Sequence, residues 1–182
     1  LWQERAPSPT ITVSNNEGLK TVTLSCSTES AKIYYTTDGT TPTTESAVYS
    51  EPITITGNED VLLKALAVCD AHAYSKPSAQ NVVLDTVTEP VPSKLPGVVQ
   101  KNSIISLSTD VPDTVIYYTV NGTTPTRESD VYSTPFIISE SIEIRTLATK
   151  DGMKDSQLSL FSYTLIDDSA PYINIASRLN DD

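Results

Sequence analysis

The sequence has little of the chemistry on which metalloenzymes and many hydrolases rely: one His, two Cys and six Gly among 182 residues. One His and two Cys without a CxxC spacing do not supply the four ligands of a structural zinc site. The scattered glycines form no phosphate-binding loop, and His72 is not accompanied by a GxSxG nucleophile motif. We therefore predict no catalytic residues, no metal and no cofactor.

Basic residues and long apolar runs are also scarce. The chain has 12 Lys and Arg against 23 Asp and Glu, a net charge of −11 that is spread along its length. Because nucleic acids and anionic membranes attract basic surfaces, neither is an expected partner. No apolar run approaches the roughly 20 residues of a membrane-spanning helix, and the chain opens at Leu1 without a signal-peptide pattern. We expect a piece of a longer protein that does not insert into membranes.

The chain is rich in β-branched residues. Thr, Val and Ile are frequent, whereas Met occurs once. β-branched side chains lose rotamer freedom in helices and pack well on pleated sheets. With 38% apolar residues, a sizeable core can also form. The composition therefore predicts an all-β fold.

The sequence contains a long internal repeat. Residues 33–55 and 116–138 are identical at 16 of 23 positions without a gap. Downstream, VLLKALA at residues 61–67 matches IEIRTLA at residues 142–148. Internal similarity of this length indicates duplicated structural units. Each copy is large enough for a small β-sandwich, so we predict two homologous domains.

We assign the first domain to residues 1–86 and the second to residues 97–166. The segment between them, residues 87–96, contains three prolines, which restrict φ and remove backbone donors and so favour a short, stiff linker. Residues 167–182 contain APYINIAS, in which Pro and Ile have the spacing of Pro, Ile and Val in SPTITVS near the start of the chain. This segment is either the first strand of a truncated third module or a polar tail.

Alternation of apolar and polar residues predicts short strands separated by turn residues. In the first copy the expected strands are residues 10–14, 21–28, 33–35, 48–56, 61–69 and 80–87. Asp38-Gly39 and Asn121-Gly122 tolerate positive φ, so we predict that these residues form structural turns that close tight hairpins. Six or seven short strands per copy are typical of a Greek-key sandwich.

The repeated motif also carries a family resemblance. The run IYYTTDGTTPT, a Tyr ten residues after its Gly, and the following PITI and LLKALAV resemble fibronectin-III-associated modules, also called chitobiase/β-hexosaminidase C-terminal-type domains. The resemblance covers nearly the whole chain, twice. It implies two tandem immunoglobulin/fibronectin-III-like β-sandwiches, of a kind appended to secreted or surface bacterial proteins, often beside glycan-processing domains. It implies no catalytic residues, and it does not settle what is bound.

Cys26 and Cys69 both continue the inward faces of strands in the first copy, the second strand and the penultimate one. Immunoglobulin-like domains place an inter-sheet disulfide there. A bridge would stabilise the domain by about 3–4 kcal/mol and would indicate an oxidising compartment. The alternative is a pair of small buried hydrophobic residues, because Leu107 and Lys150 occupy the equivalent places in the second copy. Both interpretations stay open.

By the alternation of residues along a strand, Tyr34 and Tyr117 are expected to point outward from equivalent strands of the two copies. An exposed ring on a flat sheet can stack on a sugar or pack against a protein partner. The alternative is a ring that covers neighbouring strands, since cross-strand aromatic packing is common on sheets. These two tyrosines are the ligand-binding residues that the sequence indicates.

Several carboxylates flank the repeated turn and could form a weak Ca²⁺ site: Asp38, Glu45, Glu51, Glu128 and Asp130. Their spacing matches no dense Asp-rich loop. In addition, Asn121 replaces Asp38 in the second copy, which fits a turn better than a metal ligand. We therefore predict no metal site here.

These observations predict a non-catalytic accessory module of a larger secreted or cell-surface protein. It would act as a semi-rigid spacer and contact surface, with neighbouring domains of the parent chain as partners and a cell-wall glycan or protein as a further one. The first alternative is a weak carbohydrate-binding module that uses Tyr34 and Tyr117. The second is an intracellular scaffold or appendage subunit, which reduced Cys26 and Cys69 would favour.

Overall fold

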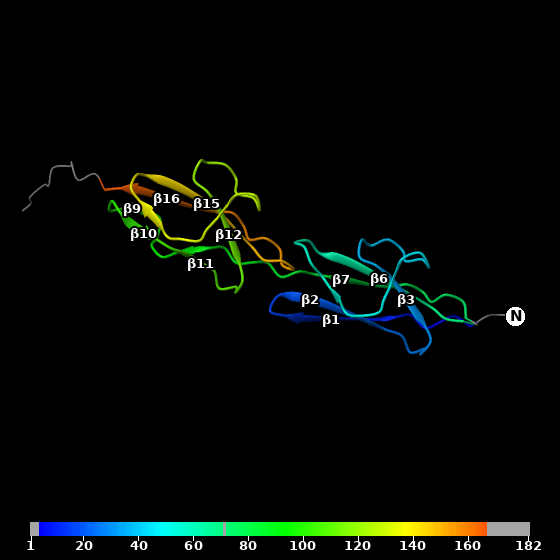
Figure 1. The fold of residues 1–182 in the computed structure, drawn as a ribbon. Helices are drawn as coiled ribbons and strands as arrows, with labels where there is room; N and C mark the ends of the chain where they lie inside the picture. Colours follow the sequence, from blue (N-terminus) through cyan, green and yellow to red (C-terminus); the bar gives the residue numbers. More distant parts are fainter. Residues whose placement is uncertain (1–3, 71, 167–182) are drawn as a thin grey trace, which may run out of the picture. The chain divides into compact units, whose positions relative to one another are not determined.

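The computed structural model describes residues 4–70 and 72–166, and this part of the chain consists of strands, turns and loops (Figure 1). The prediction of an all-β fold is confirmed. The residues that the structure describes include no helix that could cross a membrane. The chain divides into two compact units. Among the described residues, one unit runs to Thr88 and includes Val111–Val115 and Ala148–Gln157, and the other contains Glu89–Asp110, Ile116–Leu147 and residues 158–166.

The first module has two antiparallel sheets, with the strand orders β1-β2-β5 and β4-β3-β6-β7. The chain changes sheet after β2, after β4 and after β5, as in an immunoglobulin-like sandwich. Its strands are β1 (Thr10–Asn16), β2 (Leu19–Ser25), β3 (Lys32–Thr36), β4 (Ala47–Val48), β5 (Ile53–Thr54), β6 (Val61–Val68) and β7 (Ser78–Val82).

The core of the first module lies between these two sheets. Strands β1 and β2 form a hairpin whose two turn residues, Glu17 and Gly18, both have positive φ, at 51° and 91°. That geometry suits the right-handed twist of the strands. Val22, Leu24 and Leu63 lie in the buried cluster that Ile11 and Tyr35 flank. The alternation read from the sequence therefore marks the inward faces correctly.

The prediction of one strand over residues 48–56 is wrong. The structure has two short strands there, β4 and β5, which belong to different sheets. Pro52 lies between them; since it lacks an N–H and has a fixed φ, it cannot continue a ladder, and the chain crosses to the other sheet. The last strand also begins earlier than predicted, at Ser78, and ends at Val82.

The second module repeats this plan with a rearranged first strand. Its strands are β8 (Val91–Pro92), β9 (Gly97–Val99), β10 (Ser103–Ile105), β11 (Leu107–Ser108), β12 (Val115–Thr119), β13 (Asp130–Val131), β14 (Phe136–Ile138), β15 (Ile142–Thr149) and β16 (Ser159–Leu165). Here β8 pairs with β11, whereas β9 pairs in parallel with β16. Strand β8 lies within the segment that the sequence assigns to the linker.

Candidate functional site

A groove opens in the first module between the turn after β3 and the segment around β5. It encloses about 540 Å³, and an adjoining hollow of about 450 Å³ shares four of its lining residues. Strands β4 and β5 have only two residues each, so the sheets leave this side of the sandwich open. The shared lining residues are Thr37, Asp38, Thr56 and Val61.

The floor of the groove is apolar. Tyr35, Ile53 and Val61 are half-buried and pack against the core of the module. Tyr35 reaches the groove because β3 alternates, with Ile33 and Tyr35 inward and Tyr34 outward. Ile53 is held by its pairing with Val22.

The wall of the groove is a turn built around Asp38. One carboxylate oxygen, Oδ1, accepts hydrogen bonds from the Thr40 amide at 3.0 Å and from Thr40 Oγ1 at 2.6 Å. Thr36 Oγ1 donates to the Thr40 carbonyl oxygen at 2.7 Å. The hydrogen bonds from the Thr40 hydroxyl and amide lower the pKa of Asp38 below its usual 3.8. The exposed carboxylate is therefore ionised at neutral pH.

This turn differs from the predicted tight hairpin. Gly39 and Gly122 have positive φ, at 77° and 82°, but ten residues separate the end of β3 from the start of β4. The turn is shaped by the side chain of its first residue, Asp38, which accepts hydrogen bonds from the residue two positions later. In the second module Asn121 Oδ1 likewise accepts hydrogen bonds from the Thr123 amide at 3.1 Å and from Thr123 Oγ1 at 2.6 Å.

The second module fills the equivalent position with an aromatic ring. Phe136 stands where the first module has Ile53. Its ring meets that of Tyr118 edge-on, with centroids 4.9 Å apart, and lies 5.5 Å from that of Tyr132. Tyr118 is the counterpart of Tyr35. The floor therefore carries an isoleucine in one copy and a phenylalanine in the other.

Tyr34 and Tyr117 lie on the outer face of their sheets, away from the groove. Both are half-buried. Tyr34 is placed between Val48 on β4 and Leu66 on β6, and Leu66 is only 5% exposed. Tyr117 lies opposite Val131. The structure therefore does not bring these two tyrosines into the groove, and sugar stacking on them stays a prediction.

Cys26 and Cys69 are free thiols in the structure. Cys26 follows β2 directly, is half-buried against the core and lies 3.6 Å from the carbonyl oxygen of Pro7. Cys69 follows β6 directly and is buried. Their pairing as a disulfide stays a prediction. Across residues 4–70 and 72–166, no group of three or more His, Cys, Asp or Glu side chains is placed to hold a metal ion.

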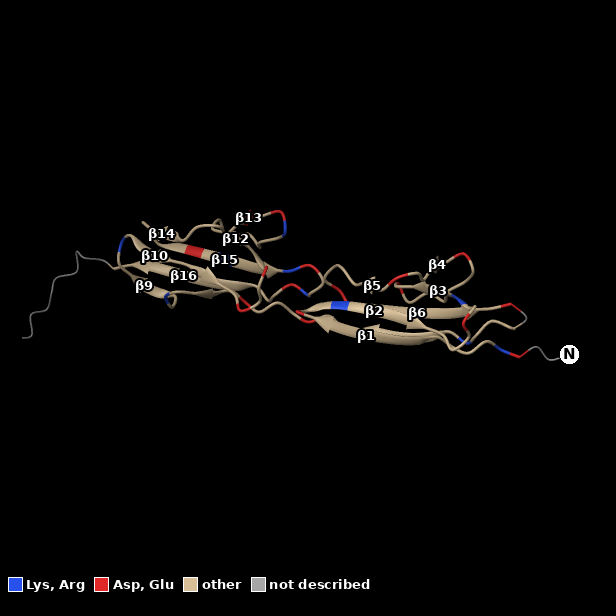
Figure 2. Ribbon diagram, turned by 60° about the horizontal axis from the view of Figure 1, so that its bottom comes forward, with Lys and Arg blue, Asp and Glu red and all other residues tan. Residues whose placement is uncertain are grey.

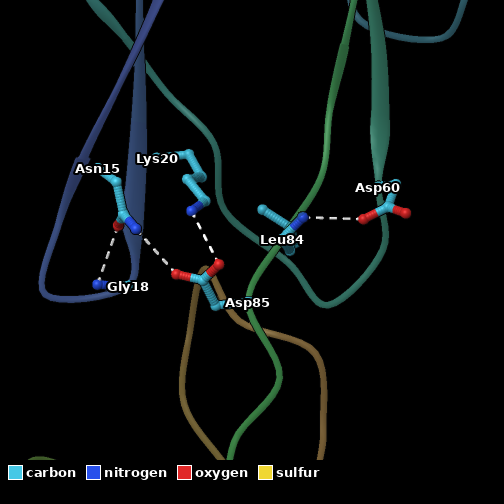
Figure 3. Close-up of polar contacts among 6 residues, drawn as sticks. All are labelled: Asn15, Gly18, Lys20, Asp60, Leu84 and Asp85. Atoms are coloured by element: carbon cyan, nitrogen blue, oxygen red, sulfur yellow. Dashed lines mark hydrogen bonds and ion pairs between the residues drawn. The ribbon is translucent and has the colours of Figure 1, made fainter.

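Sequence reasoning missed a second polar cluster, at the end of the first module where the chain leaves it (Figure 3). Asp85 accepts hydrogen bonds from Lys20 Nζ and from Asn15 Nδ2, both at 2.9 Å. Asn15 Oδ1 in turn accepts from the Gly18 amide at 3.1 Å. The Leu84 amide donates to Asp60 at 2.8 Å. No motif identifies this cluster, because its members lie up to 70 positions apart.

The environment of Asp85 favours its charged form. The hydrogen bonds from Lys20 and Asn15 hold the pKa of Asp85 below its usual 3.8. The Lys20 side chain is only 10% exposed, whereas that of Asp85 is 46% exposed. The long aliphatic part of Lys20 is thus covered by the module while its ammonium group meets the carboxylate.

We expect acid to weaken the first module partly through Asp85. A carboxyl whose pKa is lower in the folded than in the unfolded chain contributes stability above its unfolded pKa, and this contribution is lost as the pH falls through the folded value. Urea unfolding between about pH 5 and pH 2 measures the effect. The variant Asp85→Asn should show a shallower loss of stability with acid than the wild type, and equal slopes would contradict the assignment.

The family comparison agrees with the duplicated sequence. The profile of the family described as chitobiase/beta-hexosaminidase C-terminal domain matches residues 12–79 and again residues 95–160. Among solved structures, the fibronectin(III)-like modules of Clostridium thermocellum CbhA are similar, with 16% identity over 91% of this chain and 90% of that chain and a TM-score of 0.28. No curated protein sequence matches. The two profile matches cover most of the chain, which therefore belongs to the chitobiase/beta-hexosaminidase C-terminal domain family, as two tandem copies.

Proposed function

We propose that this chain is a semi-rigid spacer in a larger extracellular or cell-surface protein, where it positions neighbouring domains of its parent chain and offers sheet faces to a protein or cell-wall partner. Domains of this family are typically non-catalytic accessory modules. In Figure 2 charged residues lie mainly in loops, and most strand positions carry none.

The main support for this proposal is the way in which the chain is held where it leaves the first module, at Leu84 and Asp85. Asp85 is bound by Lys20 and Asn15 at the tip of the β1–β2 hairpin, and the Leu84 amide is bound by Asp60. The backbone that leaves the sandwich is therefore held on two sides (Figure 3). A chain anchored in this way leaves the module in a defined direction, whereas an unanchored exit would swing freely.

The segment that follows is also stiff. Pro90, the proline that precedes the second module, has a restricted φ. Pro90 is buried, and Pro92 belongs to strand β8. Since β8 begins at Val91, only residues 86–90 connect the anchored Asp85 to the second sandwich, and few freely rotating bonds remain there, as a spacer requires.

Backbone ¹⁵N relaxation of the intact chain tests the proposal. If the exit and the linker are stiff, amides of both modules should report one common rotational correlation time. Asp85→Asn removes the charge that binds Lys20, so the two modules should then tumble with separate, shorter correlation times.

Glu89→Gln is the matched control, since it removes the same charge four residues further along the chain. It should leave the common correlation time unchanged. Independent tumbling of the two modules in the wild type would contradict the spacer proposal.

A further inference from the structure

We propose that the groove of the first module binds a neutral oligosaccharide. This binding function is separate from the spacer role and does not depend on it. The site consists of the Asp38 turn, the floor formed by Tyr35, Ile53 and Val61, and the threonines around β5.

The size of the groove suits a chain of sugars. Its main part encloses about 540 Å³ and continues into the hollow of about 450 Å³. Small-molecule sites are typically about 300–1,000 Å³. The two parts adjoin through shared lining residues, and both are open to solvent. An oligosaccharide could therefore lie along the groove with both ends in solvent.

The chemistry of the lining matches a sugar ring, which has apolar C–H faces and a rim of hydroxyl groups. The half-buried Tyr35 ring, with Ile53 and Val61, offers an apolar surface for such a face. Thr54 and Thr56 also line the groove and are exposed. Each threonine hydroxyl can donate one hydrogen bond and accept others, as a sugar hydroxyl does.

Asp38 supplies the strongest acceptor in the groove. The turn uses its Oδ1 for both bonds from Thr40, which leaves Oδ2 to accept from a ligand. A hydrogen bond from a sugar hydroxyl to an ionised carboxylate is stronger than one between neutral groups. The same turn holds the carboxylate in place, so binding requires little ordering of this side chain.

The charge of the groove selects a neutral ligand. Asp38 and Glu59 lie along it, Asp60 is paired with Lys154 Nζ at 2.9 Å, and no Lys, Arg or His lines either part. A phosphate, a sulfate or an acidic sugar would be repelled by the carboxylates of Asp38 and Glu59. A cationic peptide would be attracted by charge, but it would leave the apolar floor and the threonine hydroxyls without matching groups.

The second module provides matched substitutions for the floor of the site and for its turn. Phe136 replaces Ile53 and packs edge-on against Tyr118, the counterpart of Tyr35. Asn121 replaces Asp38 and forms the same turn without charge. Ile53→Phe and Asp38→Asn thus introduce into the first module side chains that the same fold already accommodates.

The test is a ¹H–¹⁵N titration of the intact chain with soluble tetrasaccharides of chitin, cellulose and xylan. We expect saturable shifts of the amides of Thr36–Asp38 and Thr54–Thr56 with at least one of them. Ile53→Phe fills the floor and should weaken binding at least about tenfold, and Asp38→Asn should weaken it about threefold to tenfold. Tyr34→Ala and Tyr117→Ala should leave the affinity unchanged.

Three comparisons complete the design. Phe136→Leu alters the equivalent position of the second module and should not change the affinity. A tetragalacturonate and a tetralysine peptide provide an acidic and a cationic probe, and we expect neither to compete with the neutral sugar. Unchanged amide shifts away from the groove would show that each variant is folded.

The proposal is overturned if no tetrasaccharide gives saturable shifts, if binding survives Ile53→Phe, if the shifts centre on Tyr34 or Tyr117, or if only the peptide binds. None of these results bears on the spacer role, because the correlation times of the two modules are measured without a ligand.

Discussion

Replacing Leu63 by alanine will lower the free energy of unfolding of the first module by about 2–5 kcal/mol. Leu63 lies on β6, has no exposed surface and belongs to the cluster that joins the two sheets. The substitution removes buried methyl groups and leaves a cavity that the surrounding strands cannot fully close. In a domain of this size the loss should lower the melting temperature by roughly 10 °C or more.

The measurement is urea unfolding followed by the intensities of amide signals assigned to each module. Leu62→Ala is the matched control, because Leu62 is the preceding residue on the same strand but is 42% exposed. Leu62→Ala should lower the free energy of unfolding by less than about 1 kcal/mol. A similar cost for the two variants would mean that the burial pattern of β6 is not the one described.

Replacing Tyr163 by alanine will destabilise the second module by about 3–5 kcal/mol. Tyr163 lies on β16, is 1% exposed and is among the largest fully buried side chains of the described residues. Its hydroxyl donates to the carbonyl oxygen of Lys94 at 2.8 Å. It therefore fills the core and also fixes the segment that leads into β9 (Gly97–Val99).

Tyr163→Phe separates these two contributions. It keeps the ring and removes only the hydrogen bond to Lys94, so the expected cost is about 1 kcal/mol. Chemical denaturation of both variants, followed on signals of the second module, measures the difference. If the phenylalanine variant lost as much stability as the alanine variant, the hydroxyl rather than ring packing would dominate.

Alkaline pH provides an independent test of the same residue. Burial raises the pKa of Tyr163 above its usual 10.0. A raised folded pKa means that the contribution to stability is complete below the unfolded pKa and is lost as the pH rises through the folded value. The wild type should therefore lose more stability than Tyr163→Phe as the pH rises above about 10.

Several features could be predicted because neighbouring residues carry their signal. Val22 and Leu24 alternate with polar residues, as do Ile33 and Tyr35, and a strand with one buried face needs that period of two. The repeat doubled this evidence, because each copy shows the same pattern with different side chains. Both the sandwich fold and its duplication follow from these local patterns.

Other features could not be predicted because they depend on residues far apart in the chain. The segment around Pro52 has an apolar pattern that suits one strand, yet its two halves pair with different partners, β3 and β2. Pairing partners are a tertiary property, and a local pattern does not select among strands of similar character. The boundaries of the last strand were missed for the same reason.

The sequence by itself determined that this protein is a pair of all-β modules with few groups for catalysis, because composition, period and repetition are properties of the chain. Only the tertiary structure decided where a ligand could bind and how the exit of the first module is held. The sequence shows that Phe136 stands where the first copy has Ile53. Only the structure shows that the Phe136 ring packs against that of Tyr118, with the ring centroids 4.9 Å apart. Likewise, Asp85 is one acid among 23 until folding brings Lys20 to 2.9 Å from it.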